Sequence, residues 1–258
     1  MDLHLRGKRV LITGASKGIG AAAAEAFAEE GCNLRLAARS GELLKAVADR
    51  LRSAHQIDAT THVADLRKPE DIARLVKDAS DIDILVNNAG DIPGGSIDKI
   101  DEATWRYAWE LKVFGYINIT RTVYAQMKAR GGGVIVNDIG VAGEKYDSNY
   151  ICGSTGNAAL MSFTRALGSK SLADNIRVVG INPGPVGTDR HVTLLKTRAK
   201  NQFGDENRYR EFQTGLPLGR PAHAREIGDL MAFLASDRSA YTSGVIFTVD
   251  GGIAAGWG

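Results

Sequence analysis

The sequence is poor in cysteine, and it lacks long apolar runs and any strong excess of charge. Its two cysteines, Cys32 and Cys152, cannot form a disulfide framework. No apolar run approaches the roughly 18 residues of a membrane span, and residues 1–6 lack the apolar core of a signal peptide. A net charge of +2, from 32 basic and 30 acidic residues, gives no strong field for nucleic acid or anionic lipid. We therefore expect a cytoplasmic protein without a nucleic-acid or membrane partner.

Glycine is abundant, with 30 residues, although prolines number only six. An excess of glycine without an excess of proline indicates tight loops in which the backbone comes close to another group. Hydrophobic residues make up 44% of the chain and charged residues 24%, which is typical of an ordered globular protein.

Short apolar, β-branched runs alternate with longer helical patterns along the chain. This alternation predicts an α/β fold in a single domain over 1–258, a Rossmann-type doubly wound sheet of seven parallel strands with helices on both faces. The expected strands are 10–12, 34–37, 60–63, 82–86, 134–136, 176–181 and 245–249. The expected helices are 19–30, 42–54, one opening at Pro69, 104–129, 154–173 and 227–234. Segment 187–215 is expected to be long and irregular, which is typical of a functional or mobile loop.

A glycine-rich segment, Thr13 to Gly20, lies between the first expected strand and the first expected helix. Its glycines at 14, 18 and 20 allow a tight turn and let backbone amides approach a pyrophosphate at the helix N-terminus. A plain turn is the alternative, but the strand-to-helix context favours dinucleotide binding.

Just after the second expected strand stands a basic residue, Arg39, where NAD-binding proteins carry an acid for the ribose hydroxyls. A guanidinium there offers a fork of donors to a 2′-phosphate, and Lys17 adds a second positive charge. We therefore expect NADP as the cofactor and consider NAD less favoured. Asp65 and Leu66, after the third strand, are expected to face the adenine, although Asp65 could equally cap a helix.

These motifs resemble the short-chain dehydrogenase/reductase family, close to its 3-oxoacyl-carrier-protein-reductase-like branch, over almost the whole chain. Thr13 to Gly20 is similar to the family's TGxxxGxG motif, 87–90 to its NNAG motif, and 182–188 to its PG loop. Segments 218–221 and 249–252 resemble its C-terminal segments. The resemblance implies hydride transfer between a nicotinamide and a carbonyl or alcohol.

The resemblance and the loop chemistry together place sixteen residues at the cofactor. They are Gly14, Ser16, Lys17, Gly18, Ile19, Gly20, Arg39, Asp65, Leu66, Asn88, Ala89, Gly90, Pro183, Gly184, Val186 and Thr188. The resemblance also implies a substrate lid at about 187–215 and a homotetramer built through the helices at 104–129 and 154–173.

The family's catalytic Asn, Ser, Tyr and Lys are not found at the matching positions. Flanking segments align without an insertion and place these four functions at Lys112, Gly140, Gly153 and Asn157. In an alternative register Tyr150 is the acid, but Ser154 then stands where the partner lysine belongs. The standard mechanism is in doubt in both registers.

Three interpretations follow. In the first, the protein is an NADP-dependent oxidoreductase acting on a small carbonyl or alcohol with rearranged groups, in which Lys112, Tyr150 and Asn157 are the candidate catalytic residues and no metal takes part. Desolvation would lower the pKa of Lys112 and let it act as an acid, unless its side chain simply points outward. Asp138 is a further candidate.

In the second interpretation, the chain binds NADP without turnover, as a sensor or inactive partner. In the third, it is a lyase or hydratase. We favour the first because both loops that present the nicotinamide are intact.

Overall fold

Seven parallel strands form one sheet, in the order β3-β2-β1-β4-β5-β6-β7, in the computed structural model, which describes residues 1–256. The strands are β1 (Arg9–Thr13), β2 (Asn33–Ala38), β3 (Ala59–Val63), β4 (Ile84–Asn87), β5 (Gly133–Asp138), β6 (Ile176–Pro183) and β7 (Ile246–Val249). The predicted doubly wound sheet is confirmed, and each strand agrees with its prediction to within two residues at either end. The last two residues of the predicted domain, 257–258, lie outside the described residues.

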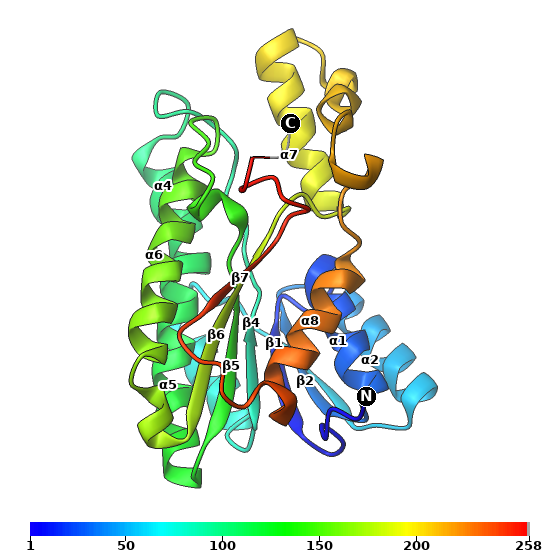
Figure 1. The fold of residues 1–258 in the computed structure, drawn as a ribbon, viewed down its shortest axis with the longest axis vertical. Helices are drawn as coiled ribbons and strands as arrows, with labels where there is room; N and C mark the ends of the chain where they lie inside the picture. Colours follow the sequence, from blue (N-terminus) through cyan, green and yellow to red (C-terminus); the bar gives the residue numbers. More distant parts are fainter. Residues whose placement is uncertain (257–258) are drawn as a thin grey trace.

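Helices cover both faces of the sheet (Figure 1). They are α1 (Gly18–Glu29), α2 (Gly41–His55), α3 (Pro69–Asp78), α4 (Glu102–Trp109), α5 (Gly115–Arg130), α6 (Ile151–Gly168), α7 (Asp189–Phe203) and α8 (Ala224–Ala235). Figure 1 shows α1, α2 and α8 on one side of the sheet and α4, α5 and α6 on the other. Among the described residues, no helix has both the length and the apolar character needed to cross a bilayer.

Alternate residues of the central strand enter two different cores. Val10 and Ile12 of β1 pack with Phe27 of α1, whereas Leu11 packs with Val123 of α5 on the opposite face. This is the two-residue side-chain period of a strand that is buried on both sides. Apolar contacts therefore hold the helices against the two faces of the sheet. The ends of the strands remain available for the polar groups of a functional site.

Two predicted helices differ from the observed ones in detail. The expected helix 104–129 contains a π-helical turn, Glu110–Phe114, between α4 and α5. The expected helix 154–173 begins earlier, at Ile151, and α6 ends at Gly168, after which a short 3-10 helix covers Ser171–Asp174. Gly168 ends α6 against a loop, since a Cβ on it would lie 2.4 Å from the backbone nitrogen of Gly244. Sequence periodicity does not report this close approach of backbone to backbone.

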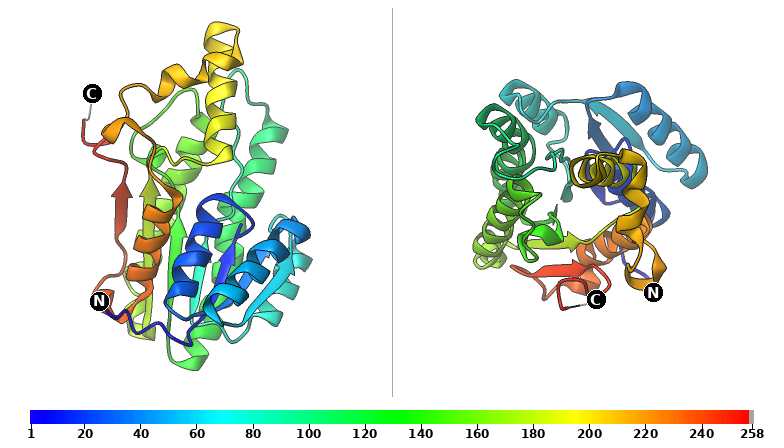
Figure 2. Two further views of the ribbon diagram at one scale, coloured as in Figure 1. Left: turned by 90° about the vertical axis from the view of Figure 1, so that its right-hand side faces the viewer. Right: turned by 90° about the horizontal axis from the view of Figure 1, so that it is seen from above.

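The expectation of an irregular segment at 187–215 is wrong. Most of it is helical, with α7 followed by a 3-10 helix over Glu206–Gln213. The Thr188 side chain caps α7 by accepting a hydrogen bond from the backbone of His191, and Leu195 and Ala199 are buried one turn apart. The left-hand view of Figure 2 shows α7, in yellow, standing beyond one end of the sheet.

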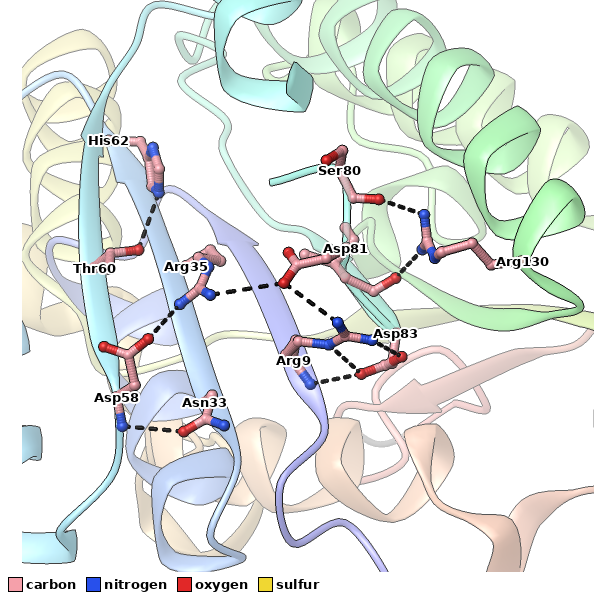
Figure 3. Close-up of polar contacts among 11 residues, drawn as sticks. Arg9, Asn33, Arg35, Asp58, Thr60, His62, Ser80, Asp81, Asp83 and Arg130 are labelled. Carbon is pink, nitrogen blue, oxygen red and sulfur yellow. Dashed lines mark hydrogen bonds and ion pairs between the residues drawn. The ribbon is translucent and has the colours of Figure 1, made fainter. Parts of the chain in front are cut away.

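Ion pairs connect the strands at the end of the sheet where β1, β3 and β4 begin (Figure 3). Arg9, at the start of β1, bonds both oxygens of Asp83, at 2.9 and 3.0 Å, and also Asp81 at 3.3 Å. Arg35 of β2 bonds Asp58 at 2.8 Å. These pairs join β1, β2 and the segments that lead into β3 and β4 at the edge opposite the carboxyl ends of the strands.

Candidate active site

Two adjoining cavities lie along the carboxyl ends of the strands, where ligands bind in open parallel sheets. The larger has a volume of about 1300 Å³ and the smaller about 460 Å³. Both are lined by Gly14, Lys17, Ala89, Gly90 and Arg190, so they form one continuous cleft.

The glycine-rich segment forms a tight turn before α1, here called the cradle, in this cleft. A Cβ on Gly20 would lie 2.4 Å from the carbonyl oxygen of Gly14, so only glycine permits this turn. Asn88 holds the loop from β4, because its Nδ2 donates to the Thr13 carbonyl at 2.8 Å. The first turn of α1 carries no acidic residue. In the described chain, the side chain of the N-cap residue Lys17 makes no capping hydrogen bond to this turn. The first amides of α1 are therefore free to bind a phosphate, which fits the pyrophosphate of a dinucleotide.

The smaller cavity contains the predicted 2′-phosphate residues. Ser16, Lys17, Arg39 and Leu66 line it, and the side chain of Arg39 is half exposed. Asp65 is absent from the described lining of both cavities, because its carboxylate turns to Arg67, whose Nη2 donates at 2.7 Å. Leu66 thus lines this cavity, whereas Asp65 lines neither cavity in the described residues.

The larger cavity contains most of the other predicted cofactor residues. Those that line it are Gly14, Lys17, Gly18, Ile19, Asn88, Ala89, Gly90, Pro183, Gly184, Val186 and Thr188. The loop after β6 folds tightly, since the backbone nitrogen of Thr188 donates to the Val186 carbonyl at 2.7 Å. Gly20 supports the cradle without lining either cavity.

All the predicted catalytic residues meet in the larger cavity. Lys112 comes from the π-helical turn, Asp138 from the end of β5, and Tyr150 and Asn157 from the start of α6. Lys112 points inward, since its Nζ donates to the Ile139 carbonyl at 2.5 Å. The alternative that this lysine points outward is therefore wrong.

Comparison with known proteins now identifies the family. Residues 8–199 match the family model described as short chain dehydrogenase. The chain belongs to the short-chain dehydrogenase family. The predicted resemblance is confirmed, and this dehydrogenase is an oxidoreductase of a family that binds NAD(P).

Named relatives and solved structures cover almost the whole dehydrogenase. Oxidoreductase UcpA of Escherichia coli is 36% identical over 253 residues, which are 96% of this chain and 95% of the relative. The 3-oxoacyl-(acyl-carrier-protein) reductase FabG of Chlamydia trachomatis is 31% identical over 254 residues, 96% of this chain and 97% of the relative. L-sorbose reductase from Gluconobacter frateurii, complexed with NADPH and L-sorbose, superposes with a TM-score of 0.90 at 33% identity and covers 98% of this chain and 99% of that one.

Burial changes the acidity of two charged groups in this dehydrogenase. Burial lowers the pKa of Lys112 to about 8, while the charge of Asp138 raises it and that of Arg190 lowers it. Burial raises the pKa of Asp138 to about 6, against the effect of Lys112. Only 6% of Asp138 is exposed, and its Oδ1 has no hydrogen-bond partner in the part of the chain that the structure describes. Both groups therefore titrate much nearer neutrality than free side chains do.

Two glycines, Gly153 and Gly140, leave space for the side chains of Tyr150 and Asn157. Ring atoms of Tyr150 lie 2.0 and 2.1 Å from where a Cβ on Gly153 would be. The Nδ2 of Asn157 lies 2.8 Å from a Cβ on Gly140, whose φ of +129° is itself unfavourable for other residues. Burial raises the pKa of Tyr150, and the nearby Arg190 opposes that shift. The phenol therefore stays protonated near neutral pH.

Sequence reasoning missed the role of Arg190, which lies in the predicted lid segment. The guanidinium crosses to the loop after β4, where Nη1 donates to Asp91 at 2.6 Å and Nη2 to the Ile92 carbonyl at 2.7 Å. No local motif marks this contact, because about a hundred residues separate the partners.

One group of metal-type ligands, Glu25, Glu29 and His55, lies away from the cleft on α1 and α2. Both carboxylates are already paired with arginines, Glu25 with Arg50 and Glu29 with Arg225. The guanidinium groups supply the positive charge that a metal ion would bring, so this group is explained as an ion-pair cluster.

Proposed function

We propose that the protein is an NADP-dependent oxidoreductase that interconverts a small carbonyl compound and its alcohol, with Lys112 as the proton donor in reduction. The observation that carries the proposal is the position of Lys112. Its ammonium lies in the larger cavity with a pKa of about 8, which suits a general acid working near neutral pH.

The choice of NADP is supported by the charge around the smaller cavity. Lys17 and Arg39 line it, and neither is engaged in a hydrogen bond to an acid among the described residues. Guanidinium and ammonium groups bind phosphate through charge-assisted hydrogen bonds, and the 2′-phosphate is the group that distinguishes NADP from NAD. The reduced cofactor, when bound, supplies a hydride.

Lys112 is proposed to act at the oxygen of the substrate carbonyl. Addition of hydride to the carbonyl carbon leaves the bonding electron pair on oxygen, and the ammonium of Lys112 gives its proton to that oxygen. The neutral amine then takes a proton from water. One N–H of Lys112 is held by the Ile139 carbonyl, which leaves the others free for the substrate.

The other candidates are assigned supporting roles. Asn157 places a neutral amide, instead of a second positive charge, beside this site, which avoids repulsion of Lys112 in a partly buried cavity. Tyr150 is proposed to orient the substrate through its protonated hydroxyl. The helix α7 and the segment after it, up to about residue 215, are proposed as the substrate lid.

The test is a coupled binding and turnover measurement on the purified chain. NADPH binding is followed by fluorescence, and NADPH consumption is followed with a panel of small ketones, hydroxyketones and aldehydes, with the matching alcohols and NADP in reverse. We expect NADPH to bind more tightly than NADH and at least one substrate pair to turn over. Tight NADPH binding without turnover in either direction would contradict the enzymatic proposal and favour a sensor or partner role.

Three wider properties are part of the same proposal. They are a homotetramer, a cytoplasmic location and a single functional domain over 1–258 with a small-molecule substrate. The oligomeric state is testable by sedimentation of the purified chain.

A further inference from the structure

Asp91 stands between two arginines at the mouth of the cofactor cleft. Its Oδ1 accepts from Arg190 Nη1 at 2.6 Å, whereas its Oδ2 is 3.8 Å from Arg39 Nη2. The first distance is that of a strong charge-assisted hydrogen bond, and the second is too long for a hydrogen bond. Asp91 is thus hydrogen-bonded to Arg190, which comes from the first turn of α7, and makes only a longer ion pair, without a hydrogen bond, to Arg39.

The second acid in this region is neutralised in the same way. Asp65 accepts from both the backbone and the guanidinium of Arg67. Burial raises the pKa of Asp65, but the bonds to Arg67 and the charges of Arg67 and Arg39 outweigh this and leave the pKa lowered. Each acidic residue near Arg39 therefore has its own arginine. Arg39 and Lys17 remain as the cations available to a ligand in the smaller cavity.

We infer that Arg190 is a cofactor-specificity residue, which neutralises Asp91 so that the 2′-phosphate of NADP can bind at Arg39. This inference rests on the proposed use of NADP. Arg190 lines the smaller cavity together with Arg39 and Asp91, although it belongs to the lid helix. The same arginine therefore ties the lid to the part of the cleft that distinguishes the two cofactors.

The physical reason is the charge on the phosphate. A 2′-phosphate carries up to about two negative charges near neutral pH, and an unpaired Asp91 would repel it and also compete for Arg39. NAD has no phosphate at that position and would be much less affected. Loss of Arg190 should consequently weaken NADPH binding more than NADH binding, even if it also loosens α7.

The experiment measures dissociation constants of NADPH and NADH by fluorescence for four variants of the full chain. Arg190→Met removes the positive charge, Asp91→Asn removes the negative charge, and the double variant removes both. Lys200→Met is the matched control, since it removes an exposed positive charge from the same helix but lies outside the described lining of both cavities.

We expect Arg190→Met to lower the preference for NADPH over NADH by about fivefold or more, as expected for an unpaired charge several ångströms from a phosphate in a solvated cleft. The double variant should return the preference to within about twofold of the unmodified protein, and the loss should shrink at high salt because the charges are solvent-accessible. Asp91→Asn alone and Lys200→Met should not lower the preference.

Two results would overturn the inference. One is an Arg190→Met preference unchanged within twofold. The other is a double variant as impaired as Arg190→Met, which would mean that lid packing and not charge is responsible. Both results concern the change in preference between variants. An unmodified protein that binds NADH as well as NADPH would contradict the proposed use of NADP, whereas the change caused by Arg190→Met would still decide the role of Arg190.

Discussion

The ring of Tyr150 occupies the place where a side chain at Gly153 would begin. Its Cε1 and Cζ lie 2.0 and 2.1 Å from the position of a Cβ on that glycine. The same ring packs against a small cluster that contains Ile92 and Cys152. The aromatic ring near the start of α6 therefore belongs to Tyr150, about one helical turn before Gly153. The ring can take this position only because residue 153 is a glycine.

Gly153→Ala should destabilise the protein by about 1–3 kcal/mol, since the new Cβ would force the Tyr150 ring out of its packing. In a Tyr150→Ala background the same change should be neutral or stabilising, because alanine is the better helix former. Urea unfolding of the two single variants and the double variant measures the coupling. Gly94→Ala is the control, since its Cβ would meet only ordinary contact at 3.6 Å. Equal costs in both backgrounds would contradict the steric explanation.

Lys112→Met should lower the turnover number at least about tenfold, because loss of a positioned acid removes roughly 10²–10⁴ in rate. The affinity for NADPH should change by no more than a factor of a few. In the unmodified enzyme the rate of carbonyl reduction should fall as the pH rises through about 8, where Lys112 loses its proton. If Lys112→Met leaves the turnover number unchanged and Tyr150→Phe abolishes activity, the tyrosine is the acid instead.

Asp138→Asn should move this pH dependence toward lower pH. The carboxylate of Asp138 raises the pKa of Lys112, so its removal leaves burial and Arg190 to lower that pKa further. The measurement is the pH profile of carbonyl reduction for the variant and the unmodified enzyme. Asp147→Asn, which alters another acid lining the same cavity, should leave the midpoint unchanged. A midpoint unmoved by Asp138→Asn would show that Asp138 does not influence the acid.

Arg39→Asp should reduce or reverse the preference for NADPH. A charge-assisted hydrogen bond contributes about 1.5–3 kcal/mol, and the new carboxylate would also repel the 2′-phosphate while accepting from a ribose hydroxyl. Fluorescence titration with NADPH and NADH measures the effect. Unchanged affinity for both cofactors would contradict the assignment of Arg39.

Asp83→Asn should lower stability at neutral pH by about 1 kcal/mol, which is about 2–4 °C in Tm for a chain of this size. Burial raises the pKa of Asp83, but its bonds to Arg9 outweigh this and leave the pKa below the ordinary value of 3.8. The stabilisation is therefore present above pH 3.8 and is lost as the pH falls through the lower pKa of the folded state. Thermal unfolding between neutral and acid pH should show the two proteins converging, and Asp49→Asn, at an exposed ion pair, should have little effect.

Local patterns were sufficient for most of the fold. Each strand is a short apolar run and each glycine loop is read from adjacent residues, so their positions followed from neighbours in the chain. The sequence predicts an irregular loop after Thr188 because the helix there is mostly polar. Its helical character depends on the Thr188 cap and on the burial of Leu195 and Ala199.

The sequence by itself determined the βα alternation, the phosphate loop at Thr13 to Gly20, and the basic residue Arg39 just after β2, because these depend on residue type and spacing alone. Only the tertiary structure decided that Lys112 points into the cavity, that the ring of Tyr150 fills the space beside Gly153, and that Arg190 pairs with Asp91. The physical reason is that desolvation, steric exclusion and ion pairing depend on the distances between groups in space. Lys112 and Ile139, like Arg190 and Asp91, come from segments that are far apart in the chain, and no local pattern records their distances. Tyr150 and Gly153 are neighbours in sequence, but the position of the ring depends on the packing around it.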